Sequence, residues 1–187
     1  MNQVEIANRA LALLGANKIN NLSEQTEEAK AINNMYKGSL KSILGECCWW
    51  FAKKRRMLNL VKVSPVFGGG NYFQLPNDLV RIFDATAEYE LEGDYLLTPS
   101  NEIGVVYTHL QENTDKYTPE FIDAFACRLA YDACYDITNS TSKQGELMNL
   151  YLGQLLPTAI SKNSRTKRQQ YAKDDAWVSS IYGGING

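Results

Sequence analysis

The spacing of apolar residues divides the chain into two helical regions with a strand-rich region between them. Residues 2–14 and 29–47 carry apolar side chains three and four positions apart, which is the repeat of an amphipathic helix. The same repeat returns in residues 121–134 and 147–159. Residues 53–110 instead alternate β-branched or aromatic residues with polar ones. These patterns predict a mainly α protein of the α+β class, with a four-helix bundle-like core and a β insertion.

Capping residues set the expected ends of these helices. Gly15 ends the first helix, because a glycine readily adopts the left-handed conformation found after many helices. Either Ser23 or Thr26 can cap the second helix, which we expect to continue to about Cys48. Thr118 precedes a proline and is expected to cap the third helix, since proline suits the first helical turn.

Residues 139–142 are four small polar residues, which should end the third helix and cap the fourth. Pro157 is expected to kink the fourth helix, because its ring displaces the carbonyl four residues earlier. The helical pattern is expected to continue to about residue 172. Four segments are expected: N-terminal helices (1–51), a β insertion (52–113), C-terminal helices (114–173) and an extended C-terminal tail for docking to a partner (174–187).

Five or six short strands are expected in the insertion, which should form a small antiparallel sheet or a barrel-like structure. The expected strands cover residues 53–63, 72–75, 79–86, 88–91, 95–98 and 103–110. Glu92-Gly93-Asp94 is typical of a hairpin turn. Gly68-Gly69-Gly70 is expected to be a flexible loop, because strand sequence follows it where a phosphate-binding loop would need a helix N-terminus.

Composition and charge limit the classes of function that the chain could have. The chain has 187 residues, of which 44% are hydrophobic, so a packed core is expected. Nineteen Lys and Arg stand against twenty-one Asp and Glu, a formal net charge of -2, so nucleic-acid binding would need a local basic patch. No run approaches 18 apolar residues and the N-terminus lacks a secretory pattern, so neither a membrane span nor a signal peptide is expected.

The cysteines and the single histidine offer no obvious metal or redox site. Cys47 and Cys48 are neighbours, and Cys127 and Cys134 are too far apart along one helix face to form a disulfide. No paired ligands stand at zinc-binding spacing, so all four are expected to be packed, reduced thiols. His109 lies in a predicted strand and is expected to be half-exposed rather than catalytic. No cofactor or metal is expected.

Acidic residues gather near the predicted hairpin. Glu88, Glu90 and Glu92 share one strand face by the two-residue repeat, and Asp94 follows at the turn. The simplest interpretation is a solvated face of an edge hairpin. Two alternatives remain: an acidic surface that faces DNA and repels its phosphates, or the carboxylate pair of a cell-wall glycan hydrolase.

A basic stretch closes the last predicted helix. It contains five Lys and Arg and no acid: Lys162, Arg165, Lys167, Arg168 and Lys173. Three interpretations are open: a solvated face near a helix C-terminus, a surface for an acidic protein partner, or a nucleic-acid site. The last would make the chain a nucleic-acid-binding or DNA-packaging accessory protein that uses residues 162–173.

Aromatic residues suggest contacts with other subunits. Trp49, Trp50 and Phe51 are consecutive and cannot all face the same way, so two are expected to enter the core and the third to lie at a partner surface. The tail contains Trp177, Ile181 and Tyr182, although a purely solvated tail would have few such residues. Large aromatic side chains are favoured anchors in protein interfaces.

The order of several short motifs resembles a known family. Ala10-Leu11-Ala12-Leu13-Leu14-Gly15 is followed by a long helix that ends in Trp49-Trp50-Phe51-Ala52. Tyr72, Leu75-Pro76 and Asp78 then precede a β region and two closing helices. This arrangement is similar to tail tubular protein A, the head-to-tail adaptor of short-tailed, podovirus-type bacteriophages.

The resemblance implies a non-enzymatic virion protein of the phage neck that assembles in the host cytoplasm. It implies a dodecameric ring between the portal and the tail nozzle, with DNA passing through the lumen without sequence-specific contacts. It also implies that the C-terminal tail binds the portal. The portal-interface candidates are then Trp177, Ile181, Tyr182, Lys162, Arg165, Lys167 and Arg168. The lumen-facing acidic candidates are Glu88, Glu90, Glu92 and Asp94, and the subunit-interface candidates are Trp49, Trp50 and Phe51.

Overall fold

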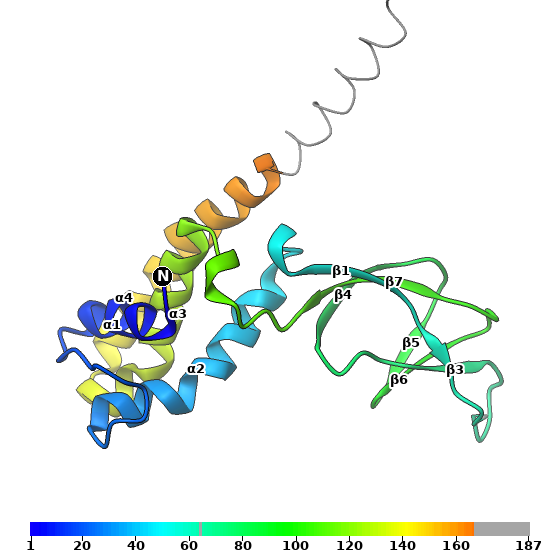
Figure 1. The fold of residues 1–187 in the computed structure, drawn as a ribbon, viewed down its shortest axis with the longest axis horizontal. Coiled ribbons are helices and arrows are strands. Elements are labelled where there is room, and N and C mark those ends of the chain that lie inside the picture. Colours follow the sequence, from blue (N-terminus) through cyan, green and yellow to red (C-terminus); the bar gives the residue numbers. More distant parts are fainter. Residues whose placement is uncertain (64, 167–187) are drawn as a thin grey trace, which may run out of the picture. The chain divides into compact units, whose positions relative to one another are not determined.

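The computed structural model describes residues 1–63 and 65–166, and within them it confirms the predicted α+β class. The described residues form four α-helices and two small antiparallel sheets, which are labelled in Figure 1 where there is room. The α-helices are α1 (Gln3–Leu14), α2 (Glu27–Glu46), α3 (Pro119–Thr138) and α4 (Thr141–Leu150). The strands are β1 (Lys53–Met57), β2 (Asn59–Leu60), β3 (Asn71–Gln74), β4 (Leu79–Ala85), β5 (Glu90–Glu92), β6 (Tyr95–Thr98) and β7 (Gly104–His109). Short helical turns are η1 (Trp50–Ala52), η2 (Thr114–Lys116) and η3 (Tyr151–Leu155).

The chain divides into two compact units. The helical unit contains Met1–Tyr36 and the residues from Tyr117 onward, and the β unit contains Lys37–Lys116. The helix α2 contributes to both, because its first half belongs to the helical unit and its second half to the β unit.

Both ends of α1 are closed by specific hydrogen bonds. The Asn2 side chain accepts from the backbone N–H of Glu5, and the Glu5 carboxylate accepts from the backbone N–H of Asn2, which forms a capping box. At the other end Gly15 has φ of 73°, and its N–H bonds to the carbonyls of Leu11 and Ala12. The predicted end at Gly15 is therefore confirmed.

The second helix begins at the later of its two predicted caps and ends earlier than expected. Thr26, and not Ser23, caps it: the Thr26 hydroxyl accepts from the N–H of Ala29. Ser23 is unavailable as a cap because it lies in a loop that is held by its own hydrogen bonds, in which the Glu24 carboxylate accepts from two backbone N–H groups. The helix ends at Glu46, two residues before the expected end at Cys48.

The helix α3 is the centre of the helical unit and packs against α1, α4 and η3. Thr118 caps it as predicted, and Asn139 ends it in the left-handed conformation. Phe125 makes an edge-to-face contact with Tyr36, with ring centroids 5.1 Å apart. An ion pair between Arg9 and Asp123 ties α1 to α3.

The fourth helix accommodates Pro157 by a change of helix type. Ser140 caps α4, and after Leu150 the chain passes through the π-helical turn η3 before residues 156–166 continue as a helix. In this turn the N–H of Leu156 bonds to the carbonyl of Tyr151, five residues earlier. A wider turn just before a proline relieves the clash that the ring would cause in a regular α-helix.

The β unit contains two sheets where one was considered. One sheet has the strand order β1-β7-β4 and the other has the order β2-β3-β6-β5, and all neighbours are antiparallel. The predicted strand 53–63 is wrong in one respect, because it breaks at Leu58. Leu58 is buried, and its N–H bonds to the carbonyl of Ile103, so β1 lies in one sheet and β2 in the other.

The core of the β unit lies between the inner faces of the two sheets. Its buried members are Leu58, Phe73, Leu96, Ile103, Val105 and Tyr107. Because Leu60, Phe73, Leu96 and Leu91 are paired across the second sheet, this row follows the inner face from one edge to the other. Only the two central members of the row are buried.

Candidate interaction surfaces

The three consecutive aromatic residues divide as the sequence predicted. Trp49 and Phe51 are buried, whereas Trp50 is 42% exposed. The Trp49 indole N–H donates to the carbonyl of Ile43 at 2.9 Å, which satisfies a carbonyl near the end of α2. The rings of Trp49 and Phe51 stack with centroids 6.0 Å apart. Whether Trp50 contacts a partner stays a prediction.

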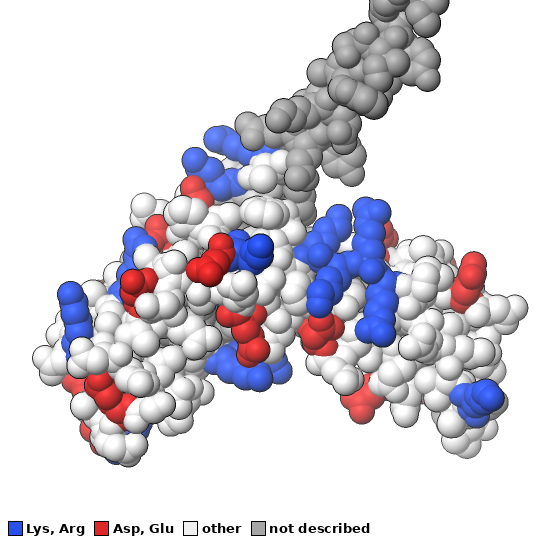
Figure 2. Space-filling model, in the orientation of Figure 1, with Lys and Arg blue, Asp and Glu red and all other residues white. Residues whose placement is uncertain are grey.

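The edge strand β1 carries the most concentrated positive charge of the β unit. Lys53, Lys54, Arg55 and Arg56 are consecutive, and all four are exposed. They form the patch of Lys and Arg that covers β1 in Figure 2. Only one side of β1 is paired, with β7, so its other side presents free backbone N–H and C=O groups.

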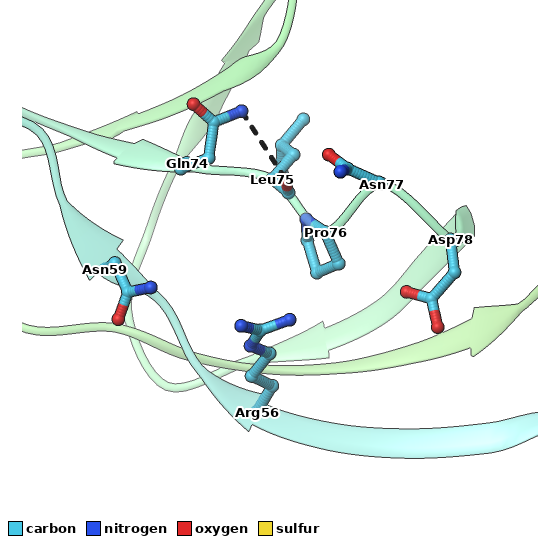
Figure 3. Close-up of a pocket in the computed structure, with 7 residues that line it drawn as sticks. All are labelled: Arg56, Asn59, Gln74, Leu75, Pro76, Asn77 and Asp78. Atoms are coloured by element: carbon cyan, nitrogen blue, oxygen red, sulfur yellow. Dashed lines mark hydrogen bonds between the residues drawn. The ribbon is translucent and has the colours of Figure 1, made fainter.

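A polar hollow of about 360 Å³ lies between β1 and the turn that follows β3. Figure 3 shows the Arg56 side chain extending from β1 toward this turn. The other lining residues are Asn59, Gln74, Leu75, Pro76, Asn77 and Asp78. The Leu-Pro-x-Asp motif of the sequence therefore forms one wall of a hollow whose opposite wall is basic.

Asp78 joins this turn to two strands. Its carboxylate is 2.6 Å from the Lys54 ammonium on β1 and accepts a 3.2 Å hydrogen bond from the Tyr107 hydroxyl on β7. Partial burial acts to raise the pKa of Asp78. The hydrogen bonds from Lys54 and Tyr107 and the positive charge of Lys54 have the larger effect, so this pKa is lower than its ordinary value. The Asp78 of the motif thus has a structural role.

The acidic candidates lie on and beside β5, which is an edge strand of the four-stranded sheet. Glu90 and Glu92 belong to β5, whereas Glu88 precedes the strand and Asp94 lies in the turn after it, so the predicted strand 88–91 is shifted. All four are exposed. The Tyr72 hydroxyl donates to the Glu92 carboxylate at 2.5 Å, and this bond raises the pKa of Tyr72.

The glycine loop lies beside these acids. Residues Phe67–Gly70 and the acidic residues Glu88, Glu90 and Glu92 line one open hollow of about 520 Å³. All three glycines have positive φ, from 71° to 108°, and a Cβ on Gly70 would lie 3.0 Å from Leu97. Next to them Val66 is 98% exposed and Phe67 is 88% exposed. The loop therefore presents two large apolar side chains to solvent.

The basic C-terminal stretch is only partly within the described residues. Lys162 and Arg165 line a hollow of about 330 Å³ that also includes Glu120, and Lys162 lies 3.9 Å from the Glu120 carboxylate. Lys167, Arg168 and Lys173 lie outside the described residues, as do Trp177, Ile181 and Tyr182.

The structure separates the cysteines into two groups. Cys127 and Cys134 are buried as expected, whereas Cys47 and Cys48 are half-buried, and no disulfide joins any of the four. Burial raises the pKa of Cys127 to about 11. His109 is half-buried, and its Nδ1 lies 2.7 Å from the Ala52 carbonyl. A carbonyl can only accept a hydrogen bond, so Nδ1 carries the hydrogen.

Neither a cluster of metal-binding side chains nor a helix suited to crossing a membrane is found in the described part of the chain.

Two features were missed as candidates by sequence reasoning: the basic edge β1 and the exposed pair Val66 and Phe67. The run Lys53-Lys54-Arg55-Arg56 was visible, but the two-residue repeat does not show whether a strand lies at a sheet edge.

No model of a known protein family matches the chain, and no curated protein matches it either.

Proposed function

We propose that this chain is a structural head-to-tail adaptor of a bacteriophage. In this proposal copies of the chain form a ring that joins the portal to the tail nozzle, and DNA passes through the lumen. The chain acts through shape and interface residues and catalyses no reaction. Its place is the neck of the virion, and the contact with the portal is made by the C-terminal residues that contain Trp177, Ile181 and Tyr182.

The observation that supports this proposal best is the role of the residues that carry the family resemblance. Gly15 ends α1 in the left-handed conformation, Trp49 bonds to α2, and Asp78 connects β1 and β7. Each is therefore needed for the fold itself. The order of the elements, with α1 and α2 before the β unit and α3 and α4 after it, is also the order that the resemblance implies.

A nucleic-acid-binding or packaging accessory role remains the second candidate. The described part of the basic stretch favours it little, because Glu120 lies beside Lys162 and offsets its charge. The glycan-hydrolase alternative has less support. A catalytic acid in this class is kept protonated by apolar surroundings, whereas Glu88, Glu90 and Glu92 are all exposed.

The proposal is tested by mixing the purified chain with portal rings of the phage that carries its gene. We expect the full chain to bind the rings and form a collar visible by electron microscopy. A chain that ends at Lys173 should keep its helical circular dichroism and lose ring binding. An intact particle whose neck lacks the chain, or a truncated chain that binds portal rings as well as the full one, would contradict the proposal and its tail assignment, respectively.

A further inference from the structure

We propose that, in the ring, the basic edge β1 of one copy pairs with the acidic edge β5 of the next copy. The inference rests on the proposed function, because it specifies how the subunits of that ring contact one another. It is argued from the charges, exposure and topology of the β unit.

The two strands are edges that can accept another strand. β1 is paired only with β7, and β5 is paired only with β6, so each presents one row of unpaired backbone groups. Every residue of both strands is exposed. Main-chain hydrogen bonds between such edges are a common means of protein association.

Their charges are opposite. β1 contains four consecutive basic residues, Lys53, Lys54, Arg55 and Arg56. β5 contains Glu90 and Glu92, and Glu88 and Asp94 flank it. Lys54 is bound to Asp78 and Glu92 to Tyr72, so these two serve the subunit's own structure. Arg55 and Arg56 make no ion pair within the described residues, nor do Glu88 and Glu90.

Exposed apolar residues accompany the charges. Leu60, on the strand that continues from β1, is 55% exposed, and Met57 at the end of β1 is 56% exposed. Leu91 in the centre of β5 is 56% exposed. Contact between the edges would cover these side chains. Leu60 and Leu91 extend the core of the β unit at its two borders.

The topology places the two edges on opposite sides of the β unit. β1 continues into β2 through Leu58, so the edges that these strands form lie together. Only four residues join β4 to β5, so the other two edges lie together on the far side. A surface on one side that fits a surface on the opposite side of an identical copy gives a head-to-tail contact. Such contacts form a ring when the rotation between successive copies closes, as the proposed function requires.

Like charges exclude the competing arrangement. A two-fold dimer would place β1 against β1, which brings eight basic residues together, or β5 against β5, which brings four glutamates together. Such juxtaposition is strongly unfavourable in an interface. Charged edges are also a common protection against indiscriminate strand pairing. Among the pairings of these two edges, the charge pattern therefore favours the contact of β1 with β5.

The test uses charge reversal at each edge of the full chain. One variant carries Arg55→Glu and Arg56→Glu, and the other carries Glu88→Lys and Glu90→Lys. Sedimentation velocity should show that the wild-type chain associates as its concentration rises, and that added salt weakens the association. Each variant alone should associate at least about tenfold more weakly, because the two reversals cancel the net charge of the altered edge and place like charges opposite part of the partner edge. An equimolar mixture of the two variants should associate again.

A charge-reversal variant outside the β unit serves as the control. Lys18→Glu with Lys30→Glu changes charge by the same amount at exposed positions of the helical unit and should leave self-association unchanged. The inference is overturned if the wild type stays monomeric up to its solubility limit, or if either edge variant associates normally. It is also overturned if the β1 variant loses only binding to duplex DNA, which would make β1 a nucleic-acid surface. A chain that still occupies the phage neck in these cases leaves the proposed function intact.

Discussion

Trp49 shows how a single side chain can terminate one element and anchor the next. It follows α2, bonds through its indole N–H to the carbonyl of Ile43, and is fully buried. We predict that Trp49→Ala lowers the free energy of unfolding by about 3–5 kcal/mol, because it leaves a cavity and an unpaired carbonyl. Urea denaturation monitored by circular dichroism measures this loss.

The matched control is the neighbouring tryptophan. Trp50 is partly exposed, so Trp50→Ala should cost no more than about 1 kcal/mol. Equal losses of unfolding free energy for Trp49→Ala and Trp50→Ala would contradict the difference in burial between the two tryptophans. The sequence indicated that two of the three aromatic residues would be buried. It could not show which two, because that depends on how η1 turns the chain after α2.

Asp78 gives a prediction for pH dependence. Its pKa is lowered in the folded chain, so its contribution is complete above its unfolded pKa of about 4 and is lost as pH falls through the lower folded value. Asp78→Asn should therefore cost about 0.5–1 kcal/mol at pH 7, the range of a partly exposed ion pair. Thermal unfolding at pH 7 and pH 3 should show that the difference between wild type and variant shrinks at pH 3.

The partner of this carboxylate supplies the control. Lys54→Met removes the same ion pair from the other side, so adding Asp78→Asn to it should cost less than Asp78→Asn costs alone. A cost that is equal in both backgrounds would show that the two residues act independently. The pair was not foreseen, because Lys54 and Asp78 are 24 positions apart and the strand break and a long loop lie between them.

At the scale of elements, two exposed glycines have opposite roles. Gly15 has φ of 73° at the end of α1, whereas Gly38 lies inside α2 with ordinary helical geometry, and neither would place a Cβ near another atom. We predict that Gly15→Ala destabilises the chain by about 1–2 kcal/mol through backbone strain. Gly38→Ala should instead stabilise it by about 0.5–1 kcal/mol. Urea midpoints of the two variants should move in opposite directions.

The elements that were predicted well are those with a local cause. Thr118 and Gly15 act on residues within one helical turn, so their roles can be inferred from the sequence. The break at Leu58 has a distant cause, because its N–H bonds to Ile103, 45 positions later in the chain. The hydrophobic alternation continues through Leu58 and therefore predicted one long strand instead of two.

At the scale of the molecule, the β unit is the part whose surface was hardest to foresee. Acidic residues near β5 were recognised because they recur at alternate positions, but the sequence does not show that β1 and β5 form opposite edges. Those positions depend on how two sheets share seven strands. Charge complementarity across the β unit is therefore a property of topology, and it became apparent only with the strand order.

The loop between β2 and β3 gives a prediction for the whole assembly. Val66 and Phe67 are almost fully exposed and add little to the stability of the isolated chain. Val66→Ser with Phe67→Ser should therefore change the free energy of unfolding by no more than about 0.5 kcal/mol. If the chain is a ring subunit, the same double variant should assemble into phage particles less efficiently, because exposed aromatic and apolar side chains serve as interface anchors. Competition between tagged wild-type and variant chains during infection measures this ratio. Equal incorporation would show that the loop faces solvent in the assembled neck.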